Sequence, residues 1–190
     1  MIDRILVSIY DAPLQKTLFV VAFFIILWIV FSVLSVKKGK FAFAFRVINF
    51  AVFFVSVFGI IAMTVLSRQE GSFQNNFIPF AYLKENEFLF DLKRSMLMNS
   101  ILFIPFSLTF PFVLGSKFSW KNAILTLVFG IMFSVCVEAV QLFLSIGKAD
   151  IDDVIFNTLG VVIGEIPYMI YGLFSRKNGE KNKHRRYKHQ

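Results

Sequence analysis

The sequence predicts an all-α integral membrane protein, a five-transmembrane-helix bundle with its N-terminus outside and its C-terminus cytoplasmic. Apolar residues make up 57% of the 190 residues, and 26 residues are Phe, more large apolar side chains than a soluble domain of this size can bury. They fall into five continuous runs, each long enough to cross the hydrocarbon core of a bilayer as a helix. Lys and Arg gather in alternate connections between these runs, as they do in multi-pass proteins.

Each predicted span holds the roughly 20 mostly apolar residues that a crossing helix needs. The third span contains Pro105 and Pro111, which membrane helices tolerate when neighbouring groups satisfy the freed carbonyls. The fourth is interrupted only by Glu138 and Gln141, and the fifth only by Glu165. The five predicted spans are residues 17–36, 47–67, 95–116, 122–144 and 154–175.

The spans divide the chain into three parts. Residues 1–16 form an extracytoplasmic segment with weak helical spacing of its apolar residues, which suits a short interfacial turn. The first span is too long for a cleaved signal peptide, and no small-residue cleavage pattern follows it. The transmembrane domain is therefore residues 17–175, and residues 176–190 form a basic, solvated cytoplasmic tail.

The net charge of +8 follows this topology. The first and third connections and the tail hold most of the 20 Lys and Arg residues, and the positive-inside rule places these regions in the cytoplasm. The opposite side holds most of the acidic residues. Nucleic-acid binding is the other use of such a charge, but topology and attraction to anionic lipid already explain it. We expect anionic lipid at the tail and no nucleic acid.

Polar residues inside spans are costly, so they are the first candidates for function. Glu138 and Gln141 lie on one face near the outer end of the fourth span. Because a short connection makes the fourth and fifth spans neighbours, we expect this face to meet the polar part of a stripe on the fifth, forming a carboxylate and amide cluster open to the outside. The glycines of the stripe form a G-x-x-x-G pair that lets another backbone approach closely. The stripe, with steps of three and four, is Asp150, Asp153, Asn157, Gly160 and Gly164.

Other uses of these polar residues stay open. The cluster could consist of interhelical hydrogen bonds and helix caps without a ligand, and Asp150 and Asp152 suit a helix start. Oxygen ligands would suit Mg²⁺ or Ca²⁺, but there is no His or Cys set for zinc, and we expect no metal and no cofactor. Glu165 in mid-span could pair with Asn49 or Asn122, or stay protonated.

The long connection of residues 68–94 contains the apolar stretch Asn76-Phe77-Ile78-Pro79-Phe80. Aromatic and apolar residues around a Pro in a polar loop indicate either an interfacial or re-entrant segment or a loop packed against the top of the bundle. Asn99 in the third span is expected at the same outer level.

Together these residues resemble the VanZ-like family of membrane proteins. The resemblance rests on the Asn76–Phe80 stretch, on Asn99 followed by Phe103-Ile104-Pro105, and on the polar string from Glu138 to Gly164, and it covers roughly residues 75–164. It implies a multi-pass protein of the bacterial cytoplasmic (cell) membrane, in a family whose founding member is linked to resistance to the glycopeptide teicoplanin. The candidates for ligand binding are Glu138, Gln141, Lys148, Asp150, Asp153 and Asn157, and the outer-loop motif is Asn76, Pro79, Phe80 and Asn99.

The chain departs from the family pattern at two positions. Lys148 stands where the family usually has Arg, so bidentate pairing with a carboxylate or phosphate is lost. Ser107 stands where the family favours Gly.

Three functions compete. The leading hypothesis is binding of a cell-envelope ligand, such as a lipid-linked precursor or a glycopeptide, by the outward-facing cluster. The alternative is an intramembrane enzyme that acts on a lipid or polyprenyl-linked envelope substrate by carboxylate acid–base chemistry, although no nucleophile motif accompanies the carboxylates. A transporter is disfavoured because the chain shows no internal repeat and no pair of broken helices.

Overall fold

The computed structural model describes residues 22–23, 25–32, 39–68, 71, 75–81, 89–115 and 117–187. For residues 39–42, 89–95 and 176–187 the description covers the backbone alone. The predicted segment of residues 1–16 lies outside the described residues. Of the predicted first span, residues 22–23 and 25–32 are helical, and the rest also lies outside them.

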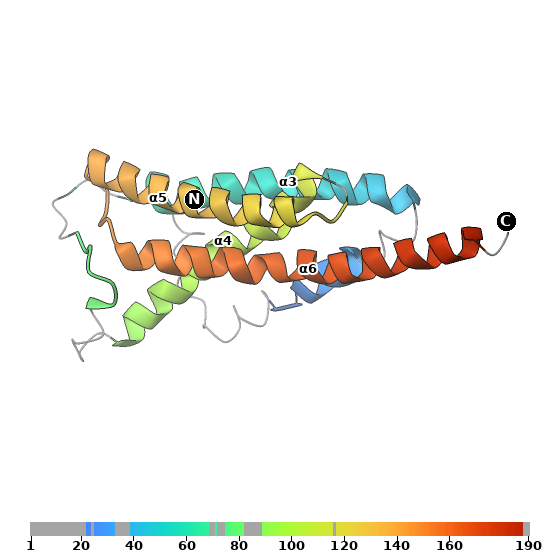
Figure 1. Ribbon diagram of the computed structural model, residues 1–190. Coiled ribbons are helices and arrows are strands. Elements are labelled where there is room, and N and C mark those ends of the chain that lie inside the picture. Colours follow the sequence, from blue (N-terminus) through green and yellow to red (C-terminus); the bar gives the residue numbers. More distant parts are fainter. Residues whose placement is uncertain are drawn as a thin grey trace.

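Long helices account for most of the described chain (Figure 1). They are α3 (Gly39–Ile61), continued by the π-helix η1 (Ala62–Leu66), then α4 (Leu89–Leu114), α5 (Trp120–Leu144) and α6 (Ile151–Tyr187). Each of the four α-helices carries a stretch long and apolar enough to cross a membrane, and these are Phe43–Leu66, Met96–Leu114, Trp120–Leu144 and Ile151–Ser175. The all-α prediction is therefore confirmed for the described residues, and the second to fifth predicted spans correspond to these helices.

The helices alternate in direction, so two sets of connections gather at the two ends of the bundle (Figure 1). We call the end where α5 stops and α6 starts the polar end; η1 also stops there and α4 starts there. The opposite end holds the connection between α4 and α5. This arrangement brings side chains that are far apart in the sequence together at the polar end, where the candidate site lies.

Two glycines on α6 set the closest helix contact. A Cβ atom added at Gly160 would overlap the carbonyl oxygen of Ser100, and one added at Gly164 would overlap Ser107 Oγ and lie against the carbonyl oxygen of Ile104. The G-x-x-x-G pair of α6 therefore packs closely against the backbone of α4. The Ser100 hydroxyl donates a hydrogen bond of 2.8 Å to the carbonyl of Phe156 across the same contact.

Aromatic residues form much of the interior. Beside the close contact, Phe103, Phe106 and Val161 are buried in one cluster, and toward the opposite end a second cluster contains Phe112 and Tyr168. Other large apolar side chains point outward from α3 and α5, where lipid would cover them. They include Phe54, Phe58, Ile124, Met132 and Phe143.

The helix α6 is longer than the fifth predicted span. It begins at Ile151, three residues earlier, and its backbone stays helical to Tyr187, where the sequence predicted only a solvated tail. Lys and Arg make up half of this extension, residues 176–187, and both residue types favour helix once a preceding turn has nucleated it. The basic segment therefore projects from the bundle as a continuation of α6 (Figure 1).

Candidate functional site

The connection between α5 and α6 folds into a tight turn that caps the next helix. Ser145 and Gly147 both have positive φ angles, 53° and 75°, which end α5 in a left-handed conformation. Asp150 then caps α6, because its Oδ1 accepts a hydrogen bond of 3.0 Å from the Asp152 backbone N–H. An Asp in this position satisfies a donor that the first helical turn would leave unpaired.

Asp150 is also the central residue of a wider network. Its backbone N–H donates to Glu138 Oε2 over 2.8 Å, so the carboxylate on α5 holds the start of α6. Its side chain accepts a hydrogen bond of 2.9 Å from Asn76 Nδ2 and lies 3.1 Å from Lys148 Nζ. Three parts of the chain therefore meet at one residue: α5, the α5–α6 turn and the loop after η1.

That loop is packed against the polar end. Asn76 forms an isolated parallel bridge with Asp150, in which its N–H donates to the Ala149 carbonyl and its own carbonyl accepts from the Ile151 N–H, both at 2.9 Å. Asn75 Oδ1 also accepts from the Ala149 N–H at 3.1 Å. The loop therefore packs against the polar end of the bundle, which is one of the two arrangements that the sequence left open.

The apolar part of the loop nevertheless points away from the bundle. Phe77 and Ile78 are 64% and 70% exposed, although the neighbouring Asn76 is buried. The Phe80 N–H donates a hydrogen bond of 2.8 Å to Asp152 Oδ1, with Phe80 at a φ of 57°. The loop is thus fixed at Asn76 and Phe80, and it presents an apolar tip between them.

Asp152 is a site residue that the sequence analysis placed only at a helix start. Its side chain is 2% exposed, and its Oδ2 atom is buried with no hydrogen-bond partner in the described residues. Helical spacing could not have indicated it, because it lies off the stripe of Asp150 and Asp153. Its partner, Phe80, is 72 positions away in the chain.

Gln141 turns toward η1 rather than toward α6, which differs from the simple face-to-face packing expected from the sequence. Its Nε2 donates to the carbonyl of Thr64 over 2.9 Å. A π-helical turn shifts the hydrogen-bond pattern of a helix, and such turns are frequent at functional sites. The other amide atom, Gln141 Oε1, is buried and has no partner among the described residues.

The polar part of α6 continues inward along α5 and α4. Asn157 Nδ2 donates to Ser134 Oγ over 2.9 Å, and Asn157 Oδ1 is buried without a partner in the described part of the chain. Asp153 lies near Asn99 of α4. The Asn99 amide nitrogen is also buried, and it makes no hydrogen bond of standard geometry to the described residues.

Arg68 adds a positive charge that the sequence analysis did not include. It lies just after η1, close enough to Glu138 and Asp153 to offset part of the repulsion between the two carboxylates. Its side chain lies beside Gly147, where an added Cβ atom would come within 3.2 Å of Arg68 Cδ. The described residues contain no group of three or more His, Cys, Asp or Glu that could hold a metal ion.

Replacing Gln141 with methionine tests the link between α5 and η1. Methionine keeps the length of the side chain but leaves the Thr64 carbonyl without its donor, and interhelical hydrogen bonds in membrane proteins average about 0.6 kcal/mol with a maximum near 1.7. We expect thermal unfolding in detergent to show a loss of about 1 kcal/mol. The partly exposed Val140 gives the matched control, because Val140→Met changes a lipid-facing position; equal stability of the two variants would contradict the role given to Gln141.

Comparison with known proteins identifies the family of this chain. A profile of the VanZ/LLP1 family matches residues 19–174, which is most of the chain. The chain belongs to the VanZ/LLP1 family. The resemblance drawn from the sequence motifs is thereby confirmed. Together with the four helices of the described residues that are long and apolar enough to cross a membrane, it identifies this VanZ/LLP1 protein as a membrane protein.

One curated relative shows how far the similarity extends. Protein VanZ of Enterococcus faecium is 34% identical over 88 residues, which cover 46% of this chain and 50% of that protein. The aligned region thus spans only about half the length of this relative. No solved structure matches this VanZ/LLP1 chain.

Proposed function

We propose that this VanZ/LLP1 protein binds a cell-envelope ligand at its polar end, either a lipid-linked precursor or a glycopeptide of the teicoplanin type. The observation that carries the proposal is a set of buried acceptor atoms without hydrogen-bond partners in the described residues. They are Gln141 Oε1, Asp152 Oδ2 and Asn157 Oδ1.

The chemistry of these atoms defines the kind of ligand. Buried polar atoms are nearly always hydrogen-bonded in native proteins, and the neighbouring Glu138 and Asp153 add carboxylate acceptors. The complementary ligand brings donors, such as peptide N–H, hydroxyl or ammonium groups. Envelope precursors and glycopeptides carry peptide and amino-sugar groups of this kind.

The loop beside the cluster supports a ligand at a membrane surface. Phe77 and Ile78 present apolar side chains next to the polar cluster, and a lipid-linked molecule has both an apolar chain and a polar head. Lys148 and Arg68 lie at the same end and supply cations for any acidic group on the ligand.

The proposal requires the polar end to face outward from the bacterial cytoplasmic membrane, with the basic extension of α6 inside near anionic lipid. The charge distribution supports this orientation. In a Cys136→Ser background, Ser145→Cys should react with a membrane-impermeant maleimide in intact cells, whereas Ser175→Cys should not. The reverse labelling pattern would contradict an outward-facing ligand.

The direct test is Asp153→Asn, which keeps the size of the side chain and removes its charge. Hydrogen bonds to charged groups contribute about 1.5–3 kcal/mol, so we expect teicoplanin to bind the purified variant in nanodiscs at least tenfold more weakly. Teicoplanin tolerance of cells expressing it should fall to that of cells without the protein. Phe143→Leu at a lipid-facing position is the control for protein abundance.

The test separates binding from other roles. Unchanged teicoplanin affinity in Asp153→Asn, with normal abundance, would remove Asp153 from the binding site. If the unmodified protein binds neither teicoplanin nor a polyprenyl-linked precursor, the proposal fails. Turnover of such a precursor, lost in Glu138→Gln, would instead favour the enzymatic alternative.

A further inference from the structure

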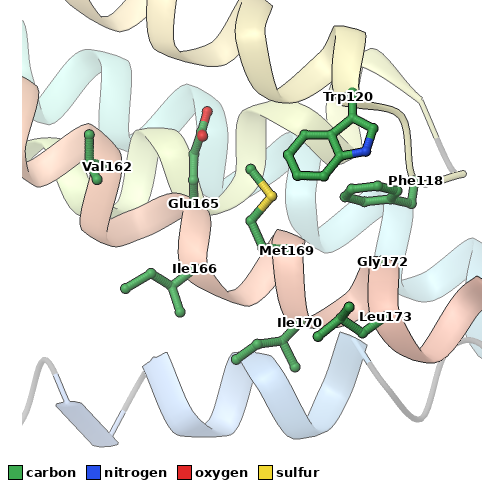
Figure 2. A pocket seen from close by; sticks show the side chains of 9 residues that line it. All are labelled: Phe118, Trp120, Val162, Glu165, Ile166, Met169, Ile170, Gly172 and Leu173. Carbon is green, nitrogen blue, oxygen red and sulfur yellow. The ribbon is translucent and has the colours of Figure 1, made fainter.

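A second candidate site lies on the apolar, lipid-facing side of the bundle, away from the polar end. It is a cavity of about 370 Å³ between α6 and the start of α5 (Figure 2). Phe118 and Trp120 form one wall, and Met169 and Leu173 lie on the α6 side. The volume is within the range of small-molecule sites, about 300–1,000 Å³.

Helix packing explains why the cavity lies at this level. Toward the polar end, α5 and α6 touch closely at Gly130, where an added Cβ atom would come within 2.6 Å of a Val161 methyl group. Beyond that contact the cavity occupies the space between Val162 on α6 and Trp120 at the start of α5.

Among the described residues that line this cavity, Glu165 is the one with an ionisable side chain. Its side chain is only 8% exposed, and its Oε1 atom is buried with no hydrogen-bond partner in the described residues. Figure 2 shows the carboxyl group extending from α6 to the same side as Met169 and Trp120.

Glu165 makes no hydrogen bond to either of the two amide side chains that the sequence suggested as partners. Asn49 Nδ2 donates to the Phe45 carbonyl at 2.6 Å, and Asn122 Nδ2 donates to the Pro111 carbonyl at 3.4 Å. Within the described chain, no Lys, Arg or His forms an ion pair with this carboxyl group.

We propose that this cavity binds a lipophilic organic cation, with Glu165 as its counter-charge. Burying a carboxylate in an apolar site is costly unless a positive charge accompanies it. The faces of Trp120 and Phe118 attract the same charge through cation–π interactions, and the apolar lining suits the hydrocarbon part of such a molecule. The occupant is thus defined by charge complementarity.

The experiment measures binding of radiolabelled tetraphenylphosphonium to the full-length protein in lipid nanodiscs. We expect saturable binding that is at least tenfold weaker in Glu165→Gln, which keeps the shape of the side chain and removes the charge. Asp153→Asn removes a carboxylate at the other end of α6 and should leave this binding unchanged. The neutral triphenylphosphine oxide should compete poorly.

A second variant tests the cavity independently of the charge. Leu173 is 70% exposed on the lipid-facing side, so Leu173→Trp should be tolerated while filling the cavity, and it should also weaken binding at least tenfold. Absence of saturable binding to the unmodified protein, or equal binding to the unmodified protein and Glu165→Gln, would overturn the proposal. The proposed teicoplanin site lies at the polar end, so the two proposals are tested separately. A negative result for tetraphenylphosphonium binding would leave the proposed teicoplanin binding untouched, and the reverse also holds.

Discussion

Replacement of Gly160 by leucine is expected to prevent the bundle from folding. A Cβ atom at this position would occupy the place of the Ser100 carbonyl oxygen, and a helix backbone cannot rotate away as a side chain can. Overpacking against side chains typically costs about 1–3 kcal/mol, and we expect more than that here. The measurement is the yield of monodisperse protein in detergent, together with its thermal unfolding.

Gly59 provides the matched control for this prediction. It also lies within a predicted span, on α3, but a Cβ atom there would meet nothing within 4 Å. We expect Gly59→Leu to give a normal yield and a stability equal to or slightly above that of the unmodified protein, because glycine is a poor helix former. Normal folding of Gly160→Leu would show that α4 and α6 do not pack as described.

Replacement of Asp150 by alanine is expected to release the loop from the polar end. The change removes the cap of α6, which is worth about 0.5–2 kcal/mol, and also the acceptor for Asn76 Nδ2. Ala149 is 2% exposed beneath the loop. In a Cys136→Ser background, a cysteine in place of Ala149 should therefore react with a water-soluble maleimide. The reaction should be at least tenfold faster when Asp150 is also replaced by alanine.

Asp150→Asn separates the geometry of this residue from its charge. Asparagine keeps an oxygen that can cap the helix and accept from Asn76, so labelling should stay close to the unmodified rate. Lys148→Met should also have little effect, because a partly exposed ion pair contributes about 0–1 kcal/mol. Equally fast labelling in the alanine and asparagine variants would show that charge, rather than the hydrogen-bond network, holds the loop.

The release of the loop has a consequence for function. Asn76 and Phe80 hold the loop through Asp150 and Asp152, and the same acids surround the proposed ligand site. A ligand that donates hydrogen bonds to the Asp152 carboxylate would compete with the Phe80 N–H for this acceptor.

The sequence by itself determined the features that depend on neighbouring residues. Hydrophobic length identified the helices, because crossing hydrocarbon is a property of one continuous segment. Helical spacing placed Asp150, the cap of α6, on one stripe with Asp153 and Asn157 of α6, and the short turn after Leu144 brought Glu138 to the start of this helix. The motifs were also sufficient to identify the family, since their order and spacing are written in the chain.

Only the tertiary structure decided which distant groups meet. Gln141 binds Thr64 rather than α6, Asp152 holds Phe80, and Arg68 lies beside two carboxylates. Spacing in the chain carries no information about such pairs, because they depend on how helices rotate and shift against one another. The glycine pair of α6 fixes that packing against α4 through a backbone contact, and the same packing leaves the cavity in which Glu165 is buried without a partner.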